Sequence, residues 1–234
     1  MSPAAGPTNV DAPTIVLLHG FPTSSHQFRN LIPLLAHKSR VVAPDYPGYG
    51  FTEVPAERKY EYTFASLTTT FEPVRRRPGA PEVRDLHIRL RRKPSPFRPV
   101  PLTSTLTPPR PARQAPVGYR FALAHPTRIT AIIAQNGNMY KEGAAPMEQA
   151  TPTACPHQCR AVPAVPRVLR TSGVPVLAIW GENDTIFVKA GAEAYRKDAK
   201  VLEMKYVENG HFALKTNEEL FAEEIQGFLE KHVE

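Results

Sequence analysis

The sequence has 234 residues, 41% of them hydrophobic, and a formal net charge of +7. These values are typical of one globular domain with a sizeable core and exclude a fibrous or fully disordered chain. No apolar run approaches the roughly 20 residues that a membrane-spanning helix needs, so we expect no membrane partner. The first 11 residues are small and polar and lack the apolar centre of a signal peptide, which predicts a cytoplasmic protein.

Proline and arginine are concentrated in one part of the chain. Eleven of the 26 prolines lie between residues 73 and 116. Residues 75–113 hold ten arginines and Lys93 against Glu82 and Asp85, a charge of +9, whereas the rest of the chain carries −2. The basic character therefore belongs to this segment and not to the protein surface in general.

The N-terminal part predicts alternating strands and helices. Residues 14–18 and 40–44 are short apolar runs, which are typical of buried strands. Ser24 or Ser25 is placed to cap a helix between them, and a second helix is expected over residues 62–71. This alternation is typical of a parallel sheet with helices on its faces.

Residues 73–114 break the alternation. Residues 83–90 alternate weakly between apolar and polar side chains, as in a half-exposed edge strand and not as in a strand buried on both faces. The prolines from Pro94 to Pro111 then disfavour any regular structure. We therefore expect no buried strand in this segment.

The second half of the chain is regular except for one stretch. Residues 142–171 are proline-rich and are expected to be irregular. Around them the apolar patterns predict strands over residues 129–135, 174–180 and 201–207 and helices over residues 117–125, 190–197 and 218–232.

Three residues after the first strand are candidates for an oxyanion hole. His19, Gly20 and Phe21 follow that strand directly, and the second strand ends in the glycine-rich loop 45–50. Gly20 lets the backbone turn tightly, and the Phe21 N–H is placed to stabilise a developing negative charge. An ordinary strand-to-loop turn is the alternative, but the two motifs together favour the functional interpretation.

Asp184 and His211 follow the last two predicted strands. Catalytic groups collect at such strand ends in open α/β sheets. An acid that orients a histidine base is the arrangement of many hydrolases. A turn aspartate and an exposed histidine are the structural alternative, which the paired positions disfavour.

These motifs resemble the α/β-hydrolase fold family, in the branch that contains epoxide hydrolases and haloalkane dehalogenases. The similarity covers roughly residues 1–71, 115–142 and 172–234. It implies an α/β fold with a mostly parallel sheet flanked by helices, a small-molecule substrate, a covalent intermediate and no cofactor.

The resemblance also implies roles for individual residues. Asp184 matches the family's acid and His211 its base, while His19, Gly20 and Phe21 match the oxyanion loop. The family's nucleophile stands on a sharp turn after the central strand, and no such turn is recognisable in this sequence.

The expected place of that turn is occupied by unsuitable residues. Ala112, Arg113 and Gln114 stand where the family has its elbow. Three other residues lie nearby without a strand–turn–helix context, namely Asp85, Ser95 and Ser104. We therefore expect an unknown nucleophile, an incomplete catalytic triad, a disrupted central strand and cap, and impaired activity.

A shifted reading frame offers one explanation. Read one nucleotide forward, the codons of residues 74–92 can encode a helix end, a buried strand and an Asp-Tyr-Gly turn of the family's kind. The same shift at residues 159–169 can give a helix like one in the family's cap. We interpret both segments as products of an aberrant gene model.

The predicted organisation has five parts. They are residues 1–72, the N-terminal half of the core; 73–114, the irregular Arg/Pro-rich segment; 115–141, a core helix and strand; 142–172, a remnant of the cap; and 173–234, the C-terminal core with the acid and the histidine.

Other functions are disfavoured but stay open. Cys155, His157 and Cys159 are residue types of a metal site, but three such residues in a proline-rich loop do not make one, so no metal is expected. The arginine-rich segment would attract phosphate, although Phe97 is the one aromatic residue there for base stacking. A non-catalytic pseudo-hydrolase or an anion- or nucleic-acid-binding product is the alternative. The sequence does not indicate the oligomeric state.

Overall fold

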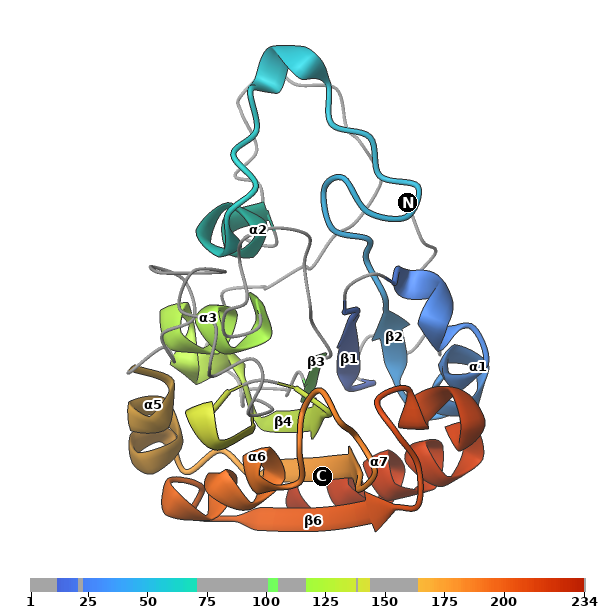
Figure 1. Ribbon diagram of the computed structural model, residues 1–234, viewed down its shortest axis with the longest axis vertical. Helices are drawn as coiled ribbons and strands as arrows, with labels where there is room; N and C mark the ends of the chain where they lie inside the picture. Colours follow the sequence, from blue (N-terminus) through green and yellow to red (C-terminus); the bar gives the residue numbers. More distant parts are fainter. Residues whose placement is uncertain are drawn as a thin grey trace.

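The computed structural model describes six stretches of the chain, which are residues 12–20, 23–70, 101–104, 117–137, 139–143 and 164–233. They form one six-stranded sheet in the order β2-β1-β3-β4-β5-β6, in which every neighbouring pair is parallel (Figure 1). The strands are β1 (Thr14–Leu18), β2 (Arg40–Val42), β3 (Pro101–Ser104), β4 (Ala131–Gln135), β5 (Val176–Gly181) and β6 (Leu202–Val207).

Helices cover both faces of this sheet, which confirms the predicted α/β class. Two of them share one core with the sheet, namely α1 (Leu31–Leu35) and α7 (Glu218–His232). On the other face lie α3 (Val117–Ala124), α5 (Ala164–Ser172) and α6 (Ala190–Glu193). The remaining helix α2 (Phe64–Thr70) packs beside α3. None of these helices, within the described stretches, is long and apolar enough to cross a membrane.

Both faces of the central strands are buried. In β4, Ile133 belongs to the core that contains α1 and α7, whereas Ile132 and Ala134 belong to the core on the opposite face. Successive side chains of a strand point to opposite faces, so a strand covered on both sides is apolar throughout. This is why the runs in β4 and β5 are recognisable from sequence.

Short 3-10 turns connect the larger elements. They are η1 (Ser25–Phe28), η2 (Ala56–Arg58), η3 (Pro126–Arg128), η4 (Lys141–Gly143), η6 (Ala194–Lys197) and η7 (Ala213–Thr216).

The helix expected after the first strand is split in two. Ser24 caps the first part, because its hydroxyl accepts a hydrogen bond from the His26 N–H at 3.3 Å. Pro33 lies three residues into α1 and has no N–H to donate to the carbonyl of Arg29, with which its ring would also clash in a continuous helix. The chain therefore forms η1, a turn, and then α1.

The expectation that residues 73–114 contain no buried strand is wrong. β3 runs from Pro101 to Ser104 and pairs with β1 on one side and β4 on the other, so the middle of the sheet is occupied. Pro101 stands first in this strand, the position where a missing N–H is tolerated. The edge strand expected over residues 83–90 lies outside the described residues.

A second correction concerns the expected irregular stretch over residues 142–171. Its last part is the helix α5. Pro166 is the third residue of this helix, and prolines are tolerated in the first turn, where no intrahelical acceptor awaits the N–H. The five-part division of the chain stays a prediction.

We predict that Thr103→Pro destabilises the protein. Thr103 lies inside β3, between Leu17 of β1 and Ile133 of β4. A proline there removes a ladder hydrogen bond and leaves its acceptor buried, at a cost of about 1–3 kcal/mol. Urea unfolding measures this free energy.

Ser95→Pro is the matched control, because the sequence there is already rich in proline. Equal stability of Thr103→Pro and Ser95→Pro would contradict a strand at residues 101–104.

Candidate active site

Four loops meet at the carboxyl edge of the sheet. His19 and Gly20 follow β1, Asn136 follows β4, Asp184 follows β5, and His211 follows β6. Because all strands are parallel, their carboxyl ends lie at the same edge. The structure thus brings the predicted acid and the predicted histidine to one place.

Asp184 and His211 form a hydrogen-bonded pair. The Nδ1 atom of His211 lies 2.9 Å from Oδ2 of Asp184. The Asp184 side chain is fully buried, whereas that of His211 keeps 13% of its surface exposed. The pair therefore has a buried acid and a histidine that is open on one side.

The Asp184 carboxylate is held by further donors. Its Oδ1 accepts from the backbone N–H groups of Ile186 at 2.7 Å and Phe187 at 3.0 Å. Burial alone would raise the pKa of Asp184, but the hydrogen bonds from His211 and these N–H groups outweigh it and lower the pKa below its ordinary value. Asp184 is therefore ionised at neutral pH and is a pure acceptor.

Asn136 is a part of this site that the sequence interpretation missed. Its Nδ2 donates to Oδ2 of Asp184 at 2.7 Å, and its Oδ1 accepts from the Gly181 N–H at 2.9 Å. Asn136 is fully buried and has a φ of 37°, a left-handed conformation that asparagine tolerates better than most residues. The signal in the sequence that could have indicated this residue was an asparagine directly after a buried strand.

Gly181 lets the loops of the acid and the histidine approach closely. A Cβ at this position would lie 2.2 Å from the Gly210 carbonyl oxygen, so no side chain fits. The neighbouring backbones are also joined, since the Asn183 N–H donates to the Asn209 carbonyl at 3.0 Å. This contact sets the distance between Asp184 and His211.

His19 supports its loop from inside the protein. It is fully buried, its Nε2 accepts from the Tyr46 N–H at 3.1 Å, and its Nδ1 lies 3.0 Å from the Gly20 carbonyl oxygen. Since an N–H can only donate, Nε2 carries no proton and Nδ1 donates to Gly20. Burial lowers the pKa of His19, in keeping with a neutral ring.

The structure describes part of the predicted oxyanion loop. Both ring nitrogens of His19 are used internally, so this side chain shapes the loop and does not donate to a ligand. The Gly20 carbonyl also accepts from the Thr23 N–H at 3.0 Å and the Thr23 hydroxyl at 2.7 Å. Phe21 lies outside the described residues, and oxyanion binding by its N–H stays a prediction.

The glycine-rich loop after β2 is organised by Asp45. Its carboxylate accepts from the N–H of Ser25 at 2.6 Å and that of Phe51 at 3.3 Å. Gly50 has a φ of 55°, and a Cβ there would lie 2.3 Å from an Asp45 oxygen. The loop therefore needs glycine at this position in order to fold back over Asp45, next to His19.

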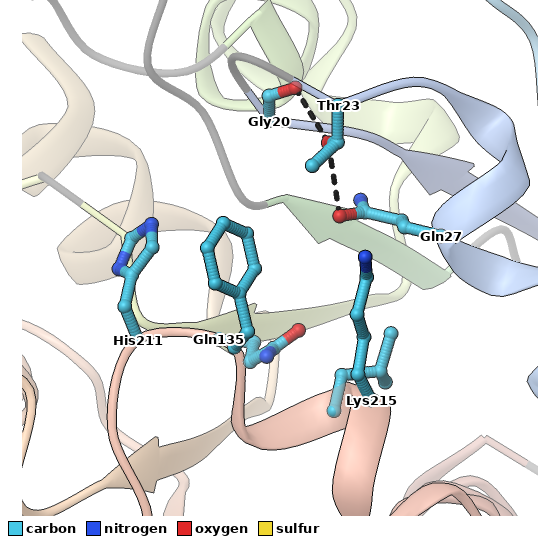
Figure 2. A pocket seen from close by; sticks show the side chains of 8 residues that line it. Gly20, Thr23, Gln27, Gln135, His211 and Lys215 are labelled. Carbon is cyan, nitrogen blue, oxygen red and sulfur yellow. Dashed lines mark hydrogen bonds between the residues drawn. The ribbon is translucent and has the colours of Figure 1, made fainter.

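A small pocket opens beside His211. It has a volume of about 10 Å³, room for about one water. Figure 2 shows His211 on one side of this pocket, with Gln27 and Lys215 on the other. The lining residues are Gly20, Thr23, Gln27, Gln135, His211, Phe212, Leu214 and Lys215.

A nucleophile is not among the residues brought together. Ser104, set aside in the sequence because no strand preceded it, does end a strand, and that strand is the central β3. The chain that follows, residues 105–116, lies outside the described part. The described residues that line the pocket beside His211 include no aspartate that could attack a substrate.

Metal binding gains no support from the structure. Among the described residues, no group of three or more His, Cys, Asp or Glu side chains could hold a metal ion. Cys155, His157 and Cys159 lie outside the described stretches, as does most of the arginine-rich segment on which an anion- or nucleic-acid-binding function depends.

Comparison with known proteins decides the family. A family model described as alpha/beta hydrolase fold matches residues 13–82. A protein of Saccharomyces cerevisiae named "Uncharacterized hydrolase YNR064C" is 34% identical over 284 residues, which covers 91% of this chain and 88% of that protein. The chain belongs to the α/β-hydrolase fold family.

Other proteins are similar to this chain over shorter stretches or in fold alone. A haloalkane dehalogenase of Mesorhizobium japonicum is 54% identical over 43 residues, 18% of this α/β hydrolase and 14% of the relative. The crystal structure of the haloalkane dehalogenase DbeA from Bradyrhizobium elkani is 15% identical, with a TM-score of 0.68 over 97% of this chain and 92% of that chain. A putative lipase from Acinetobacter baumannii is 14% identical, with a TM-score of 0.69 over 97% and 86%.

We predict that Asn136→Ala destabilises this α/β hydrolase by about 1–3 kcal/mol, because the Gly181 N–H loses its buried acceptor. Thermal and urea unfolding measure the loss. Asn136→Gly removes the same hydrogen bonds but accepts the positive φ without steric cost, so it separates the hydrogen bonds from the backbone conformation. Wild-type stability of both variants would contradict a clamping role for Asn136.

We expect Asp184→Asn to make the free energy of unfolding less dependent on pH in the acidic range. The pKa of Asp184 is lower in the folded protein than in the unfolded chain, so its contribution is complete above about pH 3.9 and is lost as the pH falls through the folded-state value. Urea unfolding at pH 7, 4 and 3 should therefore show a smaller decline for Asp184→Asn than for the wild type. An equal decline in both proteins would show that Asp184 has no such coupling.

Proposed function

We propose that this α/β hydrolase cleaves a small organic substrate with water that is activated by His211, itself oriented by Asp184. The observation that carries the proposal is the 2.9 Å hydrogen bond between a buried carboxylate and a histidine that lines a pocket. This is the geometry of an orienting acid and a general base.

The protonation of the pair follows from its hydrogen bonds. Asp184 is ionised, so the proton between the two side chains resides on Nδ1 of His211. The Nε2 atom then carries the lone pair and is the base. It takes a proton from water as the water oxygen bonds to the substrate carbon, and the proton passes to the departing oxygen.

We propose that turnover is slow compared with that of intact relatives, because no nucleophile is assigned among the described residues. Two observations support this. The lining of the pocket beside His211 includes no carboxylate, and the match to the yeast relative extends over 284 positions, more than the 234 residues of this chain, so it includes gaps in this chain. A covalent intermediate, as the resemblance implies for intact members, is then replaced by direct attack of water.

The proposed substrates are esters and epoxides. Both have an electrophilic carbon that water attacks with the help of one general base, whereas a haloalkane is a poorer match for direct attack. The similarity to a haloalkane dehalogenase keeps haloalkanes as the alternative substrate class. A non-catalytic pseudo-hydrolase is the result to be excluded.

We predict that His211→Gln lowers the rate of 4-nitrophenyl acetate and styrene oxide hydrolysis by about 100-fold or more, the usual contribution of a general base. His37→Gln is the matched control, since His37 is an exposed residue in the turn before β2, at the amino edge of the sheet. Steady-state hydrolysis rates of the three proteins give the comparison.

A fall in rate for His211→Gln alone would support the proposal. Equal rates in all three proteins, or no hydrolysis above buffer by the wild type, would refute it and favour the pseudo-hydrolase.

A further inference from the structure

The pocket beside His211 has an unbalanced charge. Lys215 is the one lysine or arginine among its lining residues, and none of them is an aspartate or a glutamate. The acid that pairs with His211, Asp184, is buried and already accepts hydrogen bonds from His211 and Asn136. An anion in the pocket would therefore meet a cation and no repelling carboxylate.

The backbone of Lys215 belongs to a well-packed turn, whereas its side chain is exposed. It belongs to η7, in which Ala213 and Leu214 are buried in the core with α7. Its N–H donates to the Phe212 carbonyl at 2.9 Å. Figure 2 shows its side chain extending towards Gln27, across the pocket from His211.

Lys215 also differs from most other lysines of the protein in having no carboxylate partner within the described stretches. Its ammonium nitrogen lies 5.5 Å from the centre of the Phe212 ring. Five other lysines form ion pairs, which are Lys38–Glu230, Lys189–Glu182, Lys197–Glu142, Lys205–Glu224 and Lys231–Glu203. The charge of Lys215 is therefore available to a ligand.

Two apolar residues also line the pocket. Phe212 is 46% exposed, although it is a large aromatic residue, and Leu214 lines the same pocket. The pocket itself holds only about one water, so a short apolar chain would rest at its mouth on the exposed Phe212 ring while its charged end reaches Lys215. The electrophilic carbon then lies on the side of His211.

We propose that Lys215 recognises a carboxylate at one end of the substrate, so that the preferred substrates are small esters or epoxides that carry a carboxylic acid group. This inference rests on the proposed function for the reacting group but concerns a different residue. It assigns Lys215 to substrate binding, with His211 left to the reaction.

The test uses butyrate as the anionic probe and butyramide as its neutral isostere, titrated into the ¹⁵N-labelled full chain and followed by NMR. We expect butyrate to bind with shifts at residues around His211, and to bind about three- to fivefold more tightly than butyramide. Lys215→Gln should abolish this preference. Lys200→Gln should retain it, because Lys200 is exposed and precedes β6, at the opposite edge of the sheet.

The same titration separates this inference from the proposed function, because binding needs no turnover. His211→Gln should lose hydrolysis and keep the preference for butyrate. Equal affinity for both probes, an unchanged preference in Lys215→Gln, or no binding of butyrate up to about 50 mM would overturn the assignment. The ¹⁵N spectra of the variants show at once whether each is folded.

Discussion

The buried carboxylate of Asp184 is the group on which the rest of this site depends. An ionised acid without exposed surface is stable only when its oxygens accept enough hydrogen bonds. Here the donors come from His211, from Asn136 and from the backbone of the loop after β5. The carboxylate thus ties together the ends of three strands, and the orientation of His211 follows from it.

The parallel sheet makes this arrangement possible. Strand β5 lies between β4 and β6, so Asn136 approaches Asp184 from one side and His211 from the other. Gly181, which has no side chain, lets the two loops touch. Further along the same edge, the buried ring of His19 fixes the start of the loop after β1. The sheet places these loops side by side, and hydrogen bonds among a few polar residues fix Asp184 and His211 relative to each other.

Much of this was predictable from sequence, for identifiable reasons. The apolar runs of β1, β4 and β5 are buried on both faces, so the fold class was recognisable without the central strand. Asp184 and His211 were found because each follows such a run. The clamp by Asn136 was missed because its role depends on a left-handed backbone that brings the amide back to Gly181 and Asp184.

The errors came from treating proline as a general breaker of structure. Pro101 begins β3 and Pro166 lies in the first turn of α5, two positions where the missing N–H has little cost. Contacts with β1 and β4 then outweigh the weak strand propensity of the short sequence at residues 101–104. Local composition could not show this, because the partners of β3 lie far away in the chain.

In the proposed reaction, His211 and Asp184 act on water directly, without a covalent intermediate. A single turnover of styrene oxide by excess enzyme in H₂¹⁸O tests it most directly, with the diol analysed by mass spectrometry. Direct attack of water places ¹⁸O in the diol of the first turnover. An unlabelled diol, with the ¹⁸O incorporated into a carboxylate of the protein, would contradict the account and show that the chain retains a nucleophile.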